Sequence, residues 1–292
     1  MHDNTAHTIA MSGASGFIGT HLRASFKAHK WNVITLDRDT LKLSPEELAR
    51  KITGCSVVIN LAGAPVIHRW TQDYKKELYN SRIPVTRNLV EAFVHMDKKP
   101  ELLISTSAVG YYSDKGTHTE TQNVTATGFL GQLARDWEQE ALKAERYGIR
   151  TVIFRFGVVL GKDGGALKQM LQPFKLGLGG TIGDGSQAFS WIHIKDLVNA
   201  YETVIKDIAY TETYNLTAPN PTTNEGLTHA LGHAFSMPTI MQIPRFALKL
   251  QYGEGAQILT GGQRVLPERL LQAGFKFTFT DIEEAVKDCI VN

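Results

Sequence analysis

The stretch 9–22, IAMSGASGFIGTHL, decides the fold of this 292-residue chain. A short apolar run leads into Gly13, Gly16 and Gly19, and a helical pattern follows them. A strand, a glycine-rich turn and a helix in this order place backbone N–H groups at a helix N-terminus, where the partial positive charge favours a phosphate group. The alternative is an ordinary strand-to-helix turn. The rest of the chain decides between the two.

Short apolar, β-rich runs recur along the first half of the chain, with helical spacing between them. Strands buried on both sides and alternating with helices indicate a parallel sheet with crossover helices. The sequence therefore predicts an α/β fold with a Rossmann-type, doubly wound parallel sheet. The expected strands are 8–11, 33–36, 57–61, 102–106 and 151–156.

The pattern loosens after about residue 160. Glycine crowds the segment 160–187, which we expect to be a long loop shaped over a site. A helix is expected near 224–235, and a closing helix from Asp281. We expect a nucleotide-binding domain over 1–243, with substrate-side insertions after about 160, and a small C-terminal domain over 244–292.

The composition bounds the partners and the compartment. The 31 basic and 29 acidic residues nearly balance at a net charge of +2, which gives no reason to expect nucleic acid or an anionic membrane as a partner. Two cysteines and scattered histidines predict neither a disulfide framework nor a metal site. The N-terminus lacks a signal-peptide pattern, and no apolar run approaches the roughly 20 residues that cross a bilayer. We expect a cytoplasmic protein with a small-molecule substrate, its oligomeric state left open.

The second strand ends at the position that reads the ribose of a dinucleotide. Asp37 would bond the ribose hydroxyls and repel a 2′-phosphate, which favours NAD. Arg38, beside it, would pair with that phosphate, which favours NADP. In this setting the glycines have separate roles: Gly13 permits the turn, Gly16 lets the pyrophosphate approach, and Gly19 lets the helix pack on the strand.

The chain resembles the extended short-chain dehydrogenase/reductase family, and more narrowly its epimerase-like branch that carries a small C-terminal domain of unknown function. The motifs that carry the resemblance span nearly the whole chain. They are SGASGFIG, VVINLAGAPV, RWTQDYKKELYNSRIPVTRNLV, ISTSAVGYYS, FRFGVVLGKDGGALKQMLQPFKLGLGGTIGDG, WIHIKDL and GGQRVLPERLLQAGF.

The resemblance implies a set of cofactor contacts beyond the glycines. It places the loop 61–63 against the adenosine and pyrophosphate, Glu77 and Arg82 at further cofactor contacts, and Val158 near the nicotinamide. A solvated charge pattern is the alternative for Glu77 and Arg82. Arg38 resembles the branch's NADP reader, so NADP is preferred and NAD stays open. The full expected set is Gly13, Ala14, Ser15, Gly16, Phe17, Ile18, Gly19, Asp37, Arg38, Leu61, Ala62, Gly63, Glu77, Arg82 and Val158.

The catalytic residues that the resemblance implies are only partly present. Enzymes of this family pair a Ser or Thr with Tyr-x-x-x-Lys on the next helix, where the Lys lowers the Tyr pKa. Ser107 matches the serine position, but the helix carries residues that cannot move a proton. These are Phe129, Leu130, Leu133 and Ala134.

Two functional hypotheses follow from the missing pair. In the first, Ser107 acts with Tyr111 or Tyr112, assisted by Glu120, Arg135 or His193, in an NAD(P)-dependent, epimerase-like oxidoreductase or isomerase of a small polar substrate such as a nucleotide sugar. Aromatic packing is the alternative for the two tyrosines. In the second, the protein binds a dinucleotide without turnover, as a sensor or scaffold.

Asp196 in WIHIKDL is expected to cap a helix that begins near Leu197.

Overall fold

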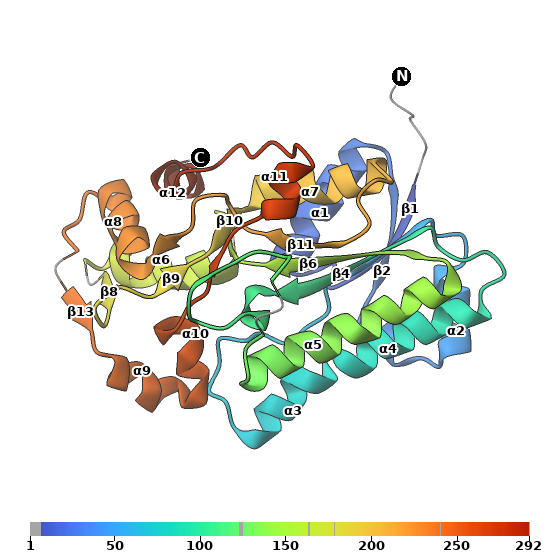
Figure 1. The fold of residues 1–292 in the computed structure, drawn as a ribbon, viewed down its shortest axis with the longest axis horizontal. Helices are drawn as coiled ribbons and strands as arrows, with labels where there is room; N and C mark the ends of the chain where they lie inside the picture. Colours follow the sequence, from blue (N-terminus) through green and yellow to red (C-terminus); the bar gives the residue numbers. More distant parts are fainter. Residues whose placement is uncertain (1–6, 123–124, 163, 178, 240, 292) are drawn as a thin grey trace.

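A six-stranded parallel sheet forms the centre of the molecule (Figure 1). The computed structural model describes residues 7–122, 125–162, 164–177, 179–239 and 241–291. The strand order is β11-β6-β4-β3-β1-β2. The fold class predicted from the sequence is confirmed. The strands are β1 (Thr8–Ser12), β2 (Asn32–Leu36), β3 (Val57–Asn60), β4 (Leu102–Ala108), β6 (Arg150–Phe156) and β11 (Thr213–Leu216).

Helices cover both faces of this sheet because its strands are apolar on both sides. Successive side chains of a strand point to opposite faces. Ile9 and Met11 accordingly pack under α1 (Phe17–Ala28) and α7 (Ile194–Lys206), whereas Ala10 packs under the helices of the other face. Figure 1 shows these two layers. The other layer contains α2 (Pro45–Ile52), α4 (Ile83–Ala92) and α5 (Phe129–Leu142), with α3 (Gln72–Asn80) beside them.

The helix starts on the second face have local causes. Ser44 and Glu47 form a capping box at the start of α2, with Pro45 in its first turn. The Thr71 side chain accepts a hydrogen bond from the Tyr74 backbone N–H and caps α3. Five 3-10 turns complete this part of the chain and its later loops: η1 (Thr40–Lys42), η2 (Phe93–His95), η3 (Val109–Tyr111), η4 (Lys143–Tyr147) and η5 (Glu254–Ala256).

The segment 160–187, expected to be a loop, contains a helix and short strands. Leu167, Leu171 and Phe174 recur at helical spacing and are buried, so α6 (Gly165–Lys175) forms in spite of the surrounding glycines. The lobe around it also contains β7 (Val158–Leu160), β8 (Gly180–Ile182), β9 (Ala188–Phe189), β10 (Trp191–His193), β12 (Thr222–Thr223), α8 (Asn224–Phe235) and β13 (Met241–Ile243). The helix predicted near 224–235 is confirmed as α8.

The residues after 243 pack into the cores formed by earlier elements. Leu270 and Phe275 belong to the same hydrophobic cluster as Ile9, while Ala285 and Val286 pack with α8. Strand β14 pairs in parallel with β5 (Thr117–His118). The division into 1–243 and 244–292 stays a prediction. The elements here are α9 (Arg245–Tyr252), α10 (Gln257–Thr260), β14 (Arg264–Val265), α11 (Glu268–Gln272) and α12 (Ile282–Val291).

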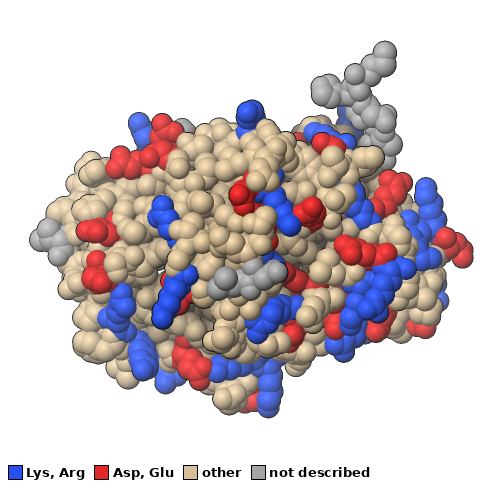
Figure 2. Space-filling model, in the orientation of Figure 1, with Lys and Arg blue, Asp and Glu red and all other residues tan. Residues whose placement is uncertain are grey.

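The surface carries both signs of charge, as the sequence balance requires. Figure 2 shows Lys and Arg interspersed with Asp and Glu over one face of the molecule. Within the described ranges, no helix combines the length and apolarity needed to cross a membrane.

The strand order fixes where a ligand can bind. Strand β2 is added on one side of β1, whereas β3 and the later strands are added on the other side, so the strand order reverses between β1 and β3. Open α/β sheets bind ligands at the carboxyl ends of the strands beside such a reversal. The glycine-rich turn between β1 and α1 lies at this edge.

Candidate functional site

The glycine-rich turn presents an open helix end. Gly13 has a φ of +66°, and its carbonyl accepts a hydrogen bond of 3.0 Å from the Gly16 N–H. Helix α1 begins at Phe17, with Gly16 as its N-cap, no side-chain cap and no acidic residue in its first turn. The positive end of the helix is therefore available to an anion.

Close packing explains two of the three glycines. A Cβ on Gly13 would lie 2.9 Å from the Leu61 carbonyl oxygen, and a Cβ on Gly19 would lie 2.4 Å from the Gly13 carbonyl oxygen. A Cβ on Gly16 would meet only Gly13 O, at 3.3 Å. Gly13 and Gly19 thus hold the turn against β3 and α1, whereas Gly16 is exposed to solvent and a Cβ there would need only a small shift of one backbone oxygen. Of their neighbours, Ala14 is buried and Ser15 is exposed.

The loop after β3 is held beside the turn by hydrogen bonds to Ser12. The Ser12 hydroxyl donates to Asn60 Oδ1 at 2.7 Å. It accepts from the backbone N–H groups of Leu61 and Ala62 at 3.0 and 3.1 Å. Gly63 follows, where a Cβ would lie 2.9 Å from the Arg82 guanidinium carbon.

Arg82 is buried and anchors that loop. Its guanidinium donates to the carbonyl oxygens of Ala64 and Leu78 at 2.9 and 3.1 Å and lies 5.1 Å from the Trp137 ring. Burial lowers the pKa of Arg82 to about 10. Glu77, by contrast, is exposed on α3.

At the end of β2, Asp37 is engaged in a local turn. Its Oδ1 accepts from the Thr40 hydroxyl at 2.7 Å and from the Thr40 N–H at 2.8 Å. These hydrogen bonds lower the pKa of Asp37. Arg38 lies beside it, exposed to solvent.

A pocket of about 590 Å³ extends from the glycine turn across the ends of β3, β4 and β6 to α6 and the segment 257–263. Several of the predicted residues line it, and the structure brings them together there: Gly13, Gly16, Phe17, Ile18, Gly19, Leu61, Gly63, Arg82, Ser107 and Val158. The other predicted residues, which do not belong to the lining, are Ala14, Ser15, Asp37, Arg38, Ala62, Glu77, Tyr111 and Tyr112.

Ser107 lies at the pocket wall with its hydroxyl bonded to a buried ion pair. Its Oγ donates to Glu138 Oε1 at 2.6 Å. Arg155 donates to both oxygens of Glu138, at 2.7 Å from Nε and 2.6 Å from Nη2. Although burial disfavours the charge of Arg155, the hydrogen bonds and attraction of Glu138 raise its pKa. The Ser107 proton is thus directed at Glu138, and the oxygen lone pairs remain for a ligand.

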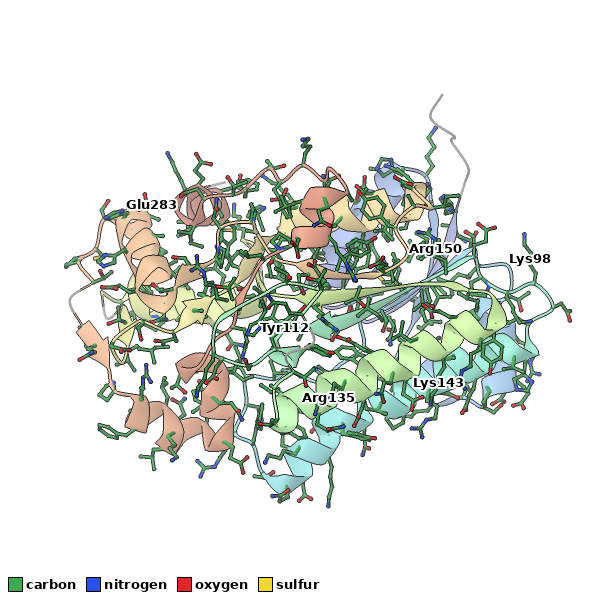
Figure 3. All side chains as sticks on the ribbon, viewed as in Figure 1. Lys98, Tyr112, Arg135, Lys143, Arg150 and Glu283 are labelled. Atoms are coloured by element: carbon green, nitrogen blue, oxygen red, sulfur yellow. The ribbon has the colours of Figure 1, made fainter. Side chains whose placement is uncertain are left out.

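Tyr112 belongs to the same network but is fully buried, inside the molecule in Figure 3. Its hydroxyl donates to Asn215 Oδ1 at 2.9 Å and accepts from Arg155 Nη1 at 2.7 Å. Burial raises the pKa of Tyr112, so the phenol stays protonated at neutral pH. The Tyr111 ring lies 3.5 Å from the Arg155 guanidinium carbon. Both tyrosines surround the ion pair rather than the pocket.

The side chains of α5 at the positions expected for Tyr and Lys pack as apolar groups. Leu130 lines the pocket close to Gly110. Phe129 packs on Trp70 with ring centroids 5.5 Å apart, and Leu133 and Trp70 are buried in that same cluster. Ala134, one turn on from Leu130, is also buried. This cluster takes the place of the proton-transferring pair.

The three residues considered as assistants lie away from the pocket lining. Glu120 accepts from the backbone N–H of Asn215 at 2.8 Å, and burial raises its pKa. Arg135, on α5 in Figure 3, donates to Ala126 O at 2.7 Å. His193 is the N-cap of α7 and contacts Asp288 at 3.3 Å.

The expected cap of α7 was wrong. The helix begins at Ile194, and the cap is His193, whose Nδ1 accepts from the Lys195 N–H at 3.2 Å. Asp196 lies inside the first turn and accepts from the backbone N–H groups of Thr278 and Phe279 at 2.7 and 2.9 Å. It fastens the C-terminal segment to the helix.

The sequence analysis missed Glu138, Arg155 and the segment 257–263. A charge inside an apolar strand, as in TVIFRF, and a carboxylate on the apolar face of a helix are the signals of a buried pair. The contribution of 257–263 has no comparable local signal. Among the residues that the structure describes, no group of three or more His, Cys, Asp or Glu side chains could hold a metal ion.

Comparisons with known proteins agree with this geometry. Residues 9–217 match the model of the NAD dependent epimerase/dehydratase family, and residues 243–289 match a domain of unknown function, DUF1731. The chloroplastic epimerase family protein SDR39U1 homolog of Arabidopsis thaliana is 36% identical over 96% of this chain and 86% of its own. The epimerase family protein YfhF of Bacillus subtilis is 34% identical over 97% and 98%.

Solved structures support the same assignment. Human epimerase family protein SDR39U1 (isoform 2), crystallised with NADPH, superposes with a TM-score of 0.90 at 31% identity, over 98% of this chain and 99% of that one. A nucleoside-diphosphate sugar epimerase from Corynebacterium glutamicum gives 0.81 at 27% identity, over 100% of this chain and 60% of that one. The resemblance inferred from the sequence is confirmed: the chain belongs to the NAD dependent epimerase/dehydratase family.

Proposed function

We propose that the chain binds NADP(H) in this pocket and is an oxidoreductase or isomerase of a small molecule. The observation that carries the proposal is that the open N-terminus of α1 and Ser107 line one pocket. NADP is preferred over NAD because Arg38 is available beside a carboxylate already engaged by Thr40, and because the human relative was crystallised with NADPH.

The residues around the turn fit a dinucleotide. The uncapped end of α1 suits a pyrophosphate, and a side chain at Gly16 would occupy the space that the phosphates need. We assign the pyrophosphate to residues 13–19, the adenosine to residues 61–63 and the 2′-phosphate to Arg38. Val158 is assigned to the nicotinamide side, and Arg82 positions the adenosine loop through its hydrogen bond to Ala64.

Ser107 and Glu138 supply the proton transfer in this proposal. The cofactor, when bound, donates or accepts a hydride. Ser107 Oγ accepts a hydrogen bond from a substrate hydroxyl, because its own proton points at Glu138. On oxidation of that hydroxyl, its proton passes to Ser107 Oγ as the Ser107 proton passes to Glu138 Oε1; reduction runs in reverse. The tyrosines then hold Arg155, not the substrate.

The first experiment is a fluorescence titration of the protein with NADPH and with NADH. We expect tighter binding of NADPH, and at least about a ten-fold loss of that affinity in Arg38→Ala with NADH binding unchanged. Arg50→Ala, at an exposed position on α2, is the matched control. Preference for NADH would move the assignment to Asp37, and binding of neither dinucleotide would refute the proposal.

A dinucleotide sensor without turnover is the second candidate, favoured by the apolar cluster where Tyr and Lys are expected. NADPH oxidation with carbonyl compounds separates the two. In the enzyme, Ser107→Ala lowers turnover by about 10²–10⁴-fold and leaves NADPH affinity unchanged. A parent protein that binds NADPH and never consumes it supports the sensor.

We also propose a cytoplasmic location, in keeping with the free, buried thiols of Cys55 and Cys289.

A further inference from the structure

The part of the pocket beyond the glycine turn is apolar. We call it the substrate half; it is bounded by α6, by β8 and β9, and by the segment 257–263. The apolar side chains that line it come from all of these elements: Met170, Ile182, Phe189, Ile258 and Leu259.

Charged side chains are nearly absent from the pocket. Among the described residues that line it, Arg82 alone is charged. Its guanidinium already donates to the carbonyl oxygens of Ala64 and Leu78, at the glycine-turn end. The substrate half therefore offers no described cation to an anionic ligand.

The polar side chains of the substrate half bond its walls to one another. Asn224 Oδ1 accepts from the Ile182 N–H at 2.8 Å, and Ser190 Oγ donates to Gln263 O at 2.7 Å. Gln187 Nε2 faces the carbonyl oxygens of Ile182 and Leu259 at 3.1 and 3.3 Å. These contacts use the Ser190 hydroxyl and the Gln187 amide N–H groups within the walls of the pocket.

Two hydrogen-bond acceptors in this region remain for a ligand. Gln187 Oε1 is buried and has no hydrogen-bond partner among the described residues, and the two carbonyls facing Nε2 fix the orientation of this amide. Ser107 Oγ also offers lone pairs, because its proton is directed at Glu138. Acceptors of this kind suit a ligand hydroxyl and repel phosphate oxygens.

The N-terminus of α6 is the remaining feature that could attract an anion, and an aromatic ring lies over it. A Cβ on Gly164 would lie 2.5 Å from Phe17 Cδ2, and a Cβ on Gly165 would lie 3.1 Å from the same ring. A Cβ on Gly161 would likewise lie 2.6 Å from Phe17 Cζ. The end of α6 is therefore in contact with Phe17.

We propose that the substrate half takes an uncharged, mainly apolar molecule with a hydroxyl group, and not a nucleoside diphosphate sugar. A diphosphate carries full negative charges whose removal from water is costly without paired cations. Apolar surface, in contrast, is stabilised by burial against the side chains that are present. This inference rests on the proposed oxidoreductase or isomerase function and narrows its substrate class.

The test is calorimetric titration of the protein, both free and saturated with NADPH. The probes are three neutral alcohols of increasing apolar area (cyclohexanol, 1-phenylethanol, 4-phenyl-2-butanol) and UDP-glucose. We expect alcohol affinity to rise along the series and to be insensitive to salt, with no binding of UDP-glucose. Ile258→Lys and Met170→Lys should each weaken binding of 4-phenyl-2-butanol by about ten-fold or more while NADPH affinity is retained. Leu250→Lys, on the exposed face of α9, is the control and should change neither affinity.

The outcomes separate this inference from the proposed function. Binding of UDP-glucose in preference to the alcohols, or binding of none of the probes, would overturn the inference while NADPH binding stands. Absence of NADPH binding would refute the proposed function, and the titrations of the free protein would still decide which class of molecule the pocket accepts. Retained NADPH binding in the lysine variants shows that they fold.

Discussion

At the scale of single residues, the Glu138–Arg155 pair determines how the Ser107 hydroxyl points. Both charged side chains are buried, with 8% and 7% of their side-chain surface exposed, and each is bonded to the other through two contacts. A buried pair of this kind contributes little net stability, but removal of one partner leaves an uncompensated charge. The effect of the pair that the structure shows is on geometry, since Glu138 accepts the Ser107 proton.

Glu138→Leu should therefore destabilise the protein by about 3–5 kcal/mol, because Arg155 stays buried without its partner. The double variant Glu138→Leu/Arg155→Met should be more stable than the single variant, since no buried charge remains. Urea unfolding measures both. Asp39→Ala, which breaks an ion pair exposed to solvent, serves as the control and should hardly change stability. Equal losses in the single and double variants would show that the pair does not act as a unit.

His193 should make stability depend on pH. Burial lowers its pKa from 6.5 to about 4, against the opposing attraction of Asp288. The folded state then binds fewer protons than the unfolded state between these values. Stability should be unaffected above pH 6.5 and should fall below it, at up to about 1.4 kcal/mol per pH unit, until about pH 4.

His193→Asn separates this titration from the capping role. Asn is a good N-cap, so α7 keeps its start and loses the titrating ring. Chemical unfolding of parent and variant from pH 8 to pH 4 measures the difference on a scale of roughly 1.4 kcal/mol per unit. Parallel stability curves would contradict the assignment.

At this scale the sequence is most informative where a pattern is local. The glycine positions of the turn follow from backbone geometry, and Gly13, Gly16 and Gly19 line the pocket; their contact with a dinucleotide stays a prediction. Tyr111 and Tyr112 stand near Ser107 in the chain, and proximity alone could not show that Arg155, on another strand, would draw them away. Asn215, whose side-chain oxygen accepts a hydrogen bond from the Tyr112 hydroxyl, lies still farther along the sequence.

At the scale of elements, the glycines of the turn between β1 and α1 differ in role: some are needed for packing, and we propose that Gly16 is needed for binding. Gly19→Ala should disrupt the turn, because its Cβ would lie 2.4 Å from a backbone oxygen that cannot move freely. Gly16→Ala should leave the fold intact and reduce NADPH affinity by about ten-fold or more, because its Cβ would occupy the phosphate side. Gly128→Ala, where nothing lies within 4 Å, is the control.

Thermal unfolding and NADPH titration on these three variants separate the effects. We expect a lowered Tm for Gly19→Ala alone and weakened binding for Gly16→Ala. Normal NADPH affinity in Gly16→Ala would contradict the assignment of the pyrophosphate to the N-terminus of α1. Gly16 and Gly128 form the closest pair for this comparison, because both are N-cap residues with extended backbone and differ in what surrounds the added methyl group.

The sequence located β1, β2, β3, β4 and β6 to within a residue or two because each is a continuous apolar run between turns. It placed α8 correctly for the same kind of reason. It missed α6 because glycines on both sides outweighed the spacing of Leu167, Leu171 and Phe174, which are buried only once the lobe has assembled. Helix propensity depends on neighbouring residues in the sequence, whereas the burial of these three side chains depends on tertiary packing.

At the scale of the whole molecule, the residues after 243 complete cores that begin elsewhere. A chain ending at 243 would expose the surface that Leu270, Phe275 and Val286 cover and would leave β5 without β14. We expect such a chain to unfold without cooperativity and to bind a hydrophobic dye, because its apolar clusters are open. A truncated chain that unfolds cooperatively and binds NADPH would instead establish 1–243 as an independent domain.

The contribution of 257–263 to the pocket wall has a consequence for biosynthesis. The glycine turn leaves the ribosome early, whereas residues 257–263 of the pocket wall, and Leu270 and Phe275 of the core beneath β1, are synthesised much later. A nascent chain therefore holds the turn long before it holds the residues that complete this core and close the pocket. Until those residues emerge, the apolar surface around the turn stays exposed, so the early part of the chain depends on protection from aggregation while synthesis continues.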